Sequence, residues 1–159
     1  MFYISILMMN LKKKDISYVL IQLLLFITYL FRISSIDFHA RLITQYAGLA
    51  LAITGAGLIL ISFINLNNNL TPFPSPKSNS TLITTGVYKY IRHPIYTGIL
   101  LSAAGYAVYS ENTLRLIVCA ALLILFLSKA AYEETLLIKK FPDYNDYKLR
   151  TAALFPGVY

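Results

Sequence analysis

Long apolar runs constrain the fold of this chain more than any other feature of its sequence. The stretch from Leu42 to Ile64 contains no Asp, Glu, Lys or Arg, and neither does the stretch from Leu116 to Ser128. A helix of about 20 apolar residues spans the roughly 30 Å hydrocarbon core of a bilayer. Only 13% of all residues are charged, against about 25% in soluble domains. We therefore expect an all-α integral membrane protein.

The apolar segments predict a bundle of about four transmembrane helices in a single membrane domain, residues 1–159. A short cytoplasmic helix should follow the bundle. The first two helices would form a hairpin over residues 16–64, and a proline- and asparagine-rich linker, Asn65 to Ser80, cannot continue a helix. The expected helices run from about Ile16 to Phe31, Leu42 to Ile64, Pro94 to Tyr109, Thr113 to Lys140 and Asp143 to Arg150.

The lengths of the third and fourth helices predict where they lie relative to the membrane. Proline at Pro94 favours a helix start, and a helix ending at Tyr109 would be only about 24 Å long. We expect this helix to begin below the headgroups, in a recess lined by protein, because its first amides need partners there. The fourth helix reaches about 42 Å, so its last turns should project into water.

Basic residues predict the orientation. The net charge is +7, and cations flank the apolar runs, which favours a membrane surface over a nucleic-acid partner. In the expected topology, eleven of the 14 Lys and Arg residues lie on one side; only Arg32, Arg41 and Arg115 lie on the other. The positive-inside rule then places both termini in the cytoplasm. Residues 1–9 precede Lys12 to Lys14, the reverse of a secretory signal, so we expect them in the mature chain.

Two minor patterns concern helix packing and metals. Gly48, Ala52 and Ala56 recur at four-residue spacing, and such a stripe lets another helix approach closely, which would also allow a homodimer. The single cysteine, Cys119, and two separated histidines do not form a zinc signature. We expect no metal site, and we assign no role to His39.

The segment from Thr84 to Gly98 carries the strongest chemical signal. It places Arg92, His93 and three tyrosines at the start of the short third helix. Free amides at a helix N-terminus favour an anion such as a carboxylate, and tyrosine faces suit an aromatic base or a sulfonium cation. Tyrosine and arginine also gather at membrane boundaries for solvation alone, so composition leaves both interpretations open.

A second cluster consists of Glu133 and Glu134 on the fourth helix, one turn after Lys129. Adjacent helical residues point about 100° apart, so we expect one carboxylate to face inward and the other outward. The inward carboxylate could accept hydrogen bonds from ribose hydroxyls or an amino group of a cofactor. Alternatively, Lys129 and Glu133 form an ordinary surface pair one turn apart.

The order of these residues resembles the isoprenylcysteine carboxyl methyltransferases and the related phospholipid methyltransferases. The resemblance covers about residues 70–157, which would form the cofactor-binding half of the protein. Two departures stand out: Pro142 replaces a glycine found in many relatives, and Lys129 replaces a common arginine. The matching residues are Gly86, Tyr88, Arg92, His93, Pro94, Tyr96, Gly98, Glu133, Glu134, Phe141, Tyr144, Tyr147 and Leu154 to Pro156.

The resemblance implies an enzyme that is a membrane methyltransferase dependent on S-adenosyl-L-methionine. The donor would bind at the cytoplasmic face under the C-terminal segment, and a lipophilic or lipidated acceptor would enter from the bilayer. We expect a carboxylate or thiol acceptor. The alternatives are a phospholipid N-methyltransferase, an NADPH-dependent enzyme resembling sterol reductases, and an inactive lipid-binding module. We assign no catalytic residue; the cofactor-binding residues implied are Tyr88, Arg92, His93, Pro94, Tyr96, Glu133 and Glu134.

Overall fold

The computed structural model describes residues 12–31, 37–66 and 69–156, and within these ranges the chain is helical with two isolated β-bridges. The expectation for residues 1–9 lies outside this part. Its helices are α2 (Lys13–Leu30), α3 (Leu42–Leu66), the 3-10 helix η3 (Gly86–Lys89), α4 (Pro94–Tyr109), α5 (Thr113–Lys140) and α6 (Tyr144–Arg150). The predicted bounds of α4 and α5 are confirmed. Helix α2 begins three residues earlier and ends one residue earlier than predicted, α3 ends two residues later, and α6 begins one residue later.

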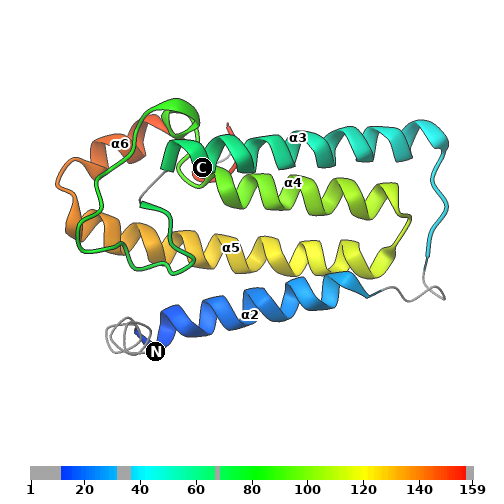
Figure 1. Ribbon diagram of the computed structural model, residues 1–159, viewed down its shortest axis with the longest axis horizontal. Helices are drawn as coiled ribbons and strands as arrows, with labels where there is room; N and C mark the ends of the chain where they lie inside the picture. Colours follow the sequence, from blue (N-terminus) through cyan, green and yellow to red (C-terminus); the bar gives the residue numbers. More distant parts are fainter. Residues whose placement is uncertain (1–11, 32–36, 67–68, 157–159) are drawn as a thin grey trace.

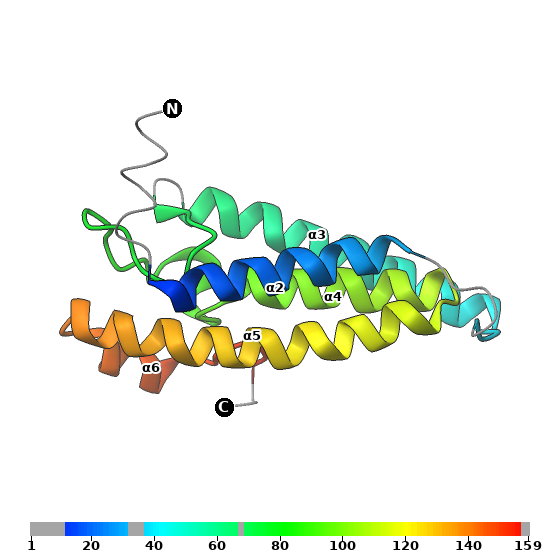
Figure 2. The same cartoon turned by 90° about the horizontal axis from the view of Figure 1, so that it is seen from below.

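The four long helices lie roughly along one axis, with α3 packed on α4, α4 on α5, and α5 on α2 (Figures 1 and 2). Local chemistry sets several of their ends. Pro94 occupies the first turn of α4, where its missing amide hydrogen costs nothing. The Asn112 side chain caps α5 by accepting a hydrogen bond from the Arg115 amide, and Pro142 follows the end of that helix.

Small residues set the close contact of α3 with α4. A Cβ added at Gly105 would lie 2.4 Å from the Gly48 carbonyl oxygen, and one at Gly55 would lie 2.5 Å from the Ser102 amide. The predicted stripe therefore serves contacts within the chain. Its third member is Gly55 instead of Ala56, because Gly55 is buried whereas Ala56 is exposed. Because Gly48 and Gly55 pack against α4, the stripe gives no support for a homodimer.

Large apolar side chains cover the outside of the bundle. Ile43, Ile64 and Ile124 are 70–76% exposed, while the interior contains Asp15, Lys129 and other polar residues as well as an apolar core around Leu122. This distribution suits a protein surrounded by hydrocarbon. Among the described helices, α3 and α5 are long and apolar enough to cross a membrane. A count of four spans is an expectation that includes the shorter α2 and α4.

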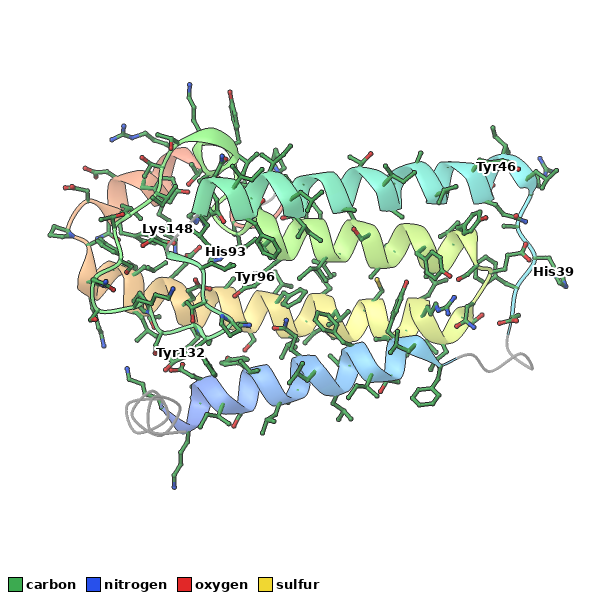
Figure 3. All side chains as sticks on the ribbon, viewed as in Figure 1. His39, Tyr46, His93, Tyr96, Tyr132 and Lys148 are labelled. Carbon is green, nitrogen blue, oxygen red and sulfur yellow. The ribbon has the colours of Figure 1, made fainter. Side chains whose placement is uncertain are left out.

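One end of the bundle gathers the segments that carry the sequence motifs. The chain between α3 and α4, the last turns of α5, and α6 all meet there (Figure 1). His93, Tyr96 and Lys148 lie at this end, whereas His39 lies at the opposite end (Figure 3). His39 is 3.8 Å from the Glu111 carboxylate, and its side chain is 95% exposed.

Candidate cofactor site

The turn that opens the motif requires a glycine. Gly86 has a φ angle of +60°, and a Cβ there would lie 2.0 Å from the Asn65 side-chain oxygen. This close approach lets Asn65 accept a hydrogen bond of 3.0 Å from the Val87 amide. The end of α3 therefore fixes η3, which holds the buried side chain of Tyr88 toward the bundle.

Arg92 and Glu134 form a buried ion pair, and the partly exposed Lys148 side chain joins it to make an ion-pair cluster. The Arg92 Nε donates to Glu134 Oε1 over 2.7 Å, and the Lys148 Nζ lies 2.8 Å from Glu134 Oε2. The Arg92 Nη1 also donates to the carbonyl oxygens of Lys148 and Thr151. Arg92 and Glu134 are 6% and 7% exposed, so these contacts compensate charges removed from water. The cluster joins α5 to the C-terminal segment, by which we mean residues 144–156, that is, α6 and the described chain after it.

The C-terminal segment packs against the residues at and just before the start of α4. The amides of Arg92 and His93 donate to the carbonyls of Ala152 and Ala153 at 2.9 and 3.1 Å. The Thr97 hydroxyl donates to the Leu154 carbonyl over 2.6 Å. Arg92 and His93 precede α4, so these two amides are not those of its first turn, and the expectation that the first-turn amides favour an anion stays a prediction.

Glu133 lies on the other side of His93 from the ion-pair cluster. Its Oε2 accepts a 2.9 Å hydrogen bond from the Tyr96 hydroxyl and lies 3.7 Å from His93 Nδ1. The Tyr96 ring stacks between His93 and Phe126, with centroid distances of 5.3 and 4.7 Å and interplanar angles of 5° and 3°. These stacks fix the ring that orients Glu133.

The two adjacent glutamates point in different directions, and neither is fully exposed. Glu134 joins the ion-pair cluster with 7% of its side chain exposed, and Glu133 is 25% exposed. The expectation that one glutamate faces outward is therefore wrong, because the C-terminal segment covers that side of α5. Lys129 does not point along the helix to form the surface pair considered above. It donates to Gln22 Oε1 and the Pro72 carbonyl over 2.7 and 3.1 Å.

A cavity of about 390 Å³ adjoins these residues, a volume in the range of small-molecule sites. Six of the seven predicted site residues line it; Glu134 does not. Its remaining wall is mainly apolar, apart from Gln22, Thr71 and Lys129. The apolar lining comes from Phe26, Phe63, Leu66, Leu70, Pro72, Ile95 and Ile99.

A smaller cavity of about 100 Å³ lies against the same central residues, toward α6. Its lining contains buried polar atoms without a hydrogen-bond partner among the described residues: the Tyr144 hydroxyl and His93 Nε2. The His93 nitrogen is 3.4 Å from Glu134 Oε1, but the geometry is not that of a hydrogen bond. Buried polar atoms rarely remain unpaired, so these two are suited to contact a ligand. Both cavities are lined by Leu66, Thr71, Tyr88, Arg92, His93 and Glu133.

Tyrosines surround the smaller cavity and are protonated at neutral pH. Burial raises the pKa of Tyr147 to about 12, and its hydroxyl donates to the Tyr88 carbonyl over 2.6 Å. Burial also raises the pKa of Tyr88 and of Tyr144 well above the ordinary value, and nearby glutamate charges act in the same direction. These residues therefore present neutral rings and hydroxyl donors.

Sequence reasoning did not identify several residues that complete the site. Lys148 and Thr151 bind the ion-pair cluster, and residues of the segment between α3 and η3 form much of the smaller cavity's wall. Only Lys148 could have been found from the sequence, because it directly follows Tyr147, which belongs to the motif that resembles the family. The segment between α3 and η3 has no sequence pattern that would have linked it to a binding site. Among the described residues, no group of three or more His, Cys, Asp or Glu could hold a metal.

Residues 43–144 match the family model described as phospholipid methyltransferase, which is more than half of the chain. Two similar curated proteins are a nickel-cobalt-cadmium resistance protein from Alcaligenes xylosoxydans xylosoxydans and a protein-S-isoprenylcysteine O-methyltransferase from Rattus norvegicus. The first is 34% identical over 52% of this chain and 39% of its own length. The second is 32% identical over 70% of this chain and 41% of its own length. The matched regions are therefore less than half of either relative.

A solved structure of a eukaryotic intramembrane Ras methyltransferase, an isoprenylcysteine carboxyl methyltransferase, has a similar fold. Its TM-score is 0.66 at 24% sequence identity, covering 72% of this chain and 43% of that one. Together with the family match across α3 to α5, it confirms the resemblance carried by the Arg-His-Pro and Glu-Glu motifs: the chain belongs to the phospholipid methyltransferase family.

Proposed function

We propose that this chain is a membrane-embedded methyltransferase that transfers a methyl group from S-adenosyl-L-methionine to a lipophilic acceptor. The observation that carries the proposal is the wall shared by the two cavities. Tyr88, Arg92, His93 and Glu133 line both a small, polar cavity under α6 and a larger, mainly apolar one. A donor on one side and an acceptor on the other would meet at this wall.

The smaller cavity suits the polar parts of the donor. The unpaired His93 Nε2 and Tyr144 hydroxyl offer hydrogen bonds to an amino acid or ribose group, and the faces of Tyr88 and Tyr147 suit an adenine ring. The bound donor supplies an electrophilic methyl carbon on a sulfonium sulfur. Glu133 and the neighbouring tyrosine faces favour a cation at the shared wall. Arg92 holds the surrounding segments together through the ion-pair cluster, and Pro94 and Tyr96 shape the larger cavity.

The larger cavity suits an acceptor with an apolar body and an anionic head. Its apolar walls accept a hydrocarbon group, and its Lys129 ammonium group has only neutral acceptors in the described structure. We infer methylation on a carboxylate or thiolate. Such a nucleophile needs no general base, whereas a neutral amine must lose a proton. One relative's name describes O-methylation of S-isoprenylcysteine, which is consistent with this choice.

The protein's contribution to the reaction is positioning and exclusion of water. The stacked rings of His93, Tyr96 and Phe126 fix the shared wall, and alignment of two reactants can lower the barrier by several kcal/mol. The residues from Ala152 to Leu154 contact Arg92, His93 and Thr97, and in our proposal this packing helps to keep water from the site. In our proposal the bundle crosses the membrane several times, with both termini and the site at the cytoplasmic face. Neutralisation of opposite charges in the transition state would benefit from this dry setting.

The proposal is tested by incubating proteoliposomes with methyl-labelled donor and lipophilic acids, thiols and amines. Alkaline treatment releases volatile labelled methanol from a methyl ester, but not from a thioether or a methylamine. We expect label on the acids or thiols, and loss of transfer in His93→Ala. Label confined to phospholipid amines would contradict the anionic acceptor, and oxidation of NADPH without methyl transfer would contradict the methyltransferase.

A further inference from the structure

The larger cavity continues into an apolar groove that runs along the bundle. This groove has a volume of about 340 Å³. The lining of cavity and groove moves by about one helical turn at a time, through Gln22, Phe26 and Tyr29 on α2 and Ile95, Ile99 and Ser102 on α4. Helix α3 runs in the opposite direction (Figure 1), and its lining passes from Phe63 back to Ile59. Phe26 and Ile99 line both spaces, so the groove extends the proposed acceptor cavity along the helices.

The residues that line the groove present an apolar surface. Its lining includes the buried side chain of Leu122. The Ser102 hydroxyl donates to the Ala52 carbonyl over 3.2 Å, and the Tyr29 hydroxyl donates to the Ala103 carbonyl over 2.6 Å. Because both hydroxyls already have partners, a hydrocarbon chain can lie there without leaving them unpaired.

The groove ends at Tyr29 and Tyr106, and a cation packs against both rings. The Arg115 guanidinium carbon lies 5.6 Å from the centroid of the Tyr29 ring and 4.9 Å from that of Tyr106. The Arg115 Nε also donates to the Tyr29 carbonyl over 3.3 Å. A hydrocarbon chain that passed these rings would desolvate the guanidinium charge, which is costly. We therefore expect a chain in the groove to end before Arg115.

The length of the groove sets the length of chain that it can hold. From Ile95 to Tyr106, α4 rises by about 16 Å. A fully extended polypeptide advances about 3.5 Å for every three backbone bonds, or about 1.2 Å per bond, and a hydrocarbon chain of similar geometry needs roughly 14 bonds to cover about 16 Å.

We propose that the groove binds the hydrocarbon chain of the methyl acceptor, and that Tyr29 and Tyr106 limit this chain to about 14 carbon atoms. The inference rests on the proposed function. Continuity with the larger cavity selects the occupant, because the cavity presents the Lys129 ammonium group and the groove is apolar. A molecule that fills both therefore has an anionic head near Lys129 and one chain directed toward Tyr106.

A photoreactive acid tests the groove without methyl transfer. The probe is a straight-chain carboxylic acid of about 14 carbon atoms with a diazirine near the end of its chain, added to the full-length protein in phosphatidylcholine nanodiscs without donor. We expect labelling of groove residues, mapped by mass spectrometry, and loss of this label when excess unlabelled acid is present. Ala103→Phe places a ring in the groove and should lower the competed label by about tenfold, equivalent to about 1.4 kcal/mol of binding.

Ala120→Phe is the matched control, because Ala120 is exposed on α5 and lines neither the two cavities nor the groove. Its competed label should equal that of wild type. Equal competed label in wild type and folded Ala103→Phe would overturn the proposal. So would label that excess acid does not suppress and that spreads over the exposed helix faces, because bilayer lipid would then occupy the groove.

The limit on chain length is tested with competing acids of about 10, 14 and 18 carbon atoms, which bracket the expected length. In wild type, competition should strengthen from the shortest acid to the middle one and then stop strengthening. Tyr106→Ala should let the longest acid compete about tenfold better, the effect of burying roughly two further methylene groups. Tyr106 is 42% exposed, so this variant also serves if Ala103→Phe does not fold. The same length dependence in wild type and Tyr106→Ala would overturn the limit.

Donor titration separates this inference from the proposed function. Protein that binds S-adenosyl-L-methionine but shows no competed label in the groove overturns the inference alone. Protein that takes the label in the groove but binds no donor refutes the proposed function, and leaves the groove as a binding site for a single-chain acid.

Discussion

Replacing Glu134 with glutamine should destabilise the fold, whereas the same change at Glu133 should chiefly weaken donor binding. The variant Glu134→Gln keeps the shape and one oxygen acceptor, but it leaves the buried Arg92 guanidinium without an anionic partner. Removing one member of a buried pair costs about 3–5 kcal/mol. The Lys148 side chain is 45% exposed and can turn to water, and the carbonyls of Lys148 and Thr151 still accept from Arg92. We therefore expect a loss of about 2–3 kcal/mol.

The corresponding change at Glu133 removes no ion pair of this kind. Glutamine still accepts from the Tyr96 hydroxyl, so the stability loss should stay below about 1 kcal/mol. Glu133 lines both cavities, and loss of a charge-assisted contact costs about 1.5–3 kcal/mol of binding. At about 1.4 kcal/mol per tenfold change, donor affinity should fall by about 10- to 150-fold.

The assay combines thermal unfolding of detergent-solubilised protein with calorimetric titration of the donor. A loss of 2–3 kcal/mol should lower the melting temperature of Glu134→Gln by about 4–12 °C. The Glu133→Gln protein should melt within about 4 °C of wild type. A larger fall for Glu133→Gln than for Glu134→Gln would refute the division of roles, whatever the ligand proves to be.

Other variants test separate parts of the account. His93→Ala should reduce donor affinity by at least about tenfold, which is the effect of losing one charge-assisted contact. The control variant Lys13→Ala should bind the donor as tightly as wild type does. Thr97→Val should lower stability by about 1–3 kcal/mol, because the Leu154 carbonyl loses its buried partner; an unchanged melting temperature would contradict that contact. Gly105→Ala should disrupt the α3–α4 contact, whereas Gly57→Ala, with nothing within 4 Å, should not, and equal melting temperatures for the two would exclude a role for the close contact. The pKa of Tyr147 is raised to about 12. Wild type should therefore be more stable than Tyr147→Phe by a constant amount at pH 7–9, and this difference should shrink as the pH rises from 10 toward 12. A difference that grows between pH 10 and 12 would contradict the raised pKa.

Helix positions were predictable because they depend on local pattern. Pro94 set the start of α4 and Phe141-Pro142 the end of α5, and apolar runs determined the lengths between them. The partner of the small-residue stripe was not predictable, because a stripe permits close approach without specifying which helix approaches. Spacing alone favoured Ala56, whereas the crossing of α4 over α3 brings Gly55 into contact.

The central residues of the candidate site were predictable from motif order, but their mutual contacts were not. Arg92 and His93 looked equivalent in sequence, yet Arg92 is occupied by Glu134 and backbone carbonyls while His93 retains an unpaired nitrogen. That difference depends on the C-terminal segment, which returns to cover the start of α4. The contacts of Lys140 with Lys77 and Ser78 were equally hidden, because both are to backbone carbonyls about 60 residues away in the chain.

Titration of S-adenosyl-L-methionine into purified protein in detergent, without added metal, is the decisive test of the proposed donor site. Parallel titrations use S-adenosylhomocysteine and NADPH. We expect saturable binding of S-adenosyl-L-methionine and S-adenosylhomocysteine with a rise in melting temperature, no binding of NADPH, and weakened donor binding in His93→Ala and Glu133→Gln. Absence of heat and of thermal stabilisation at millimolar S-adenosyl-L-methionine, from protein that unfolds cooperatively, would contradict it.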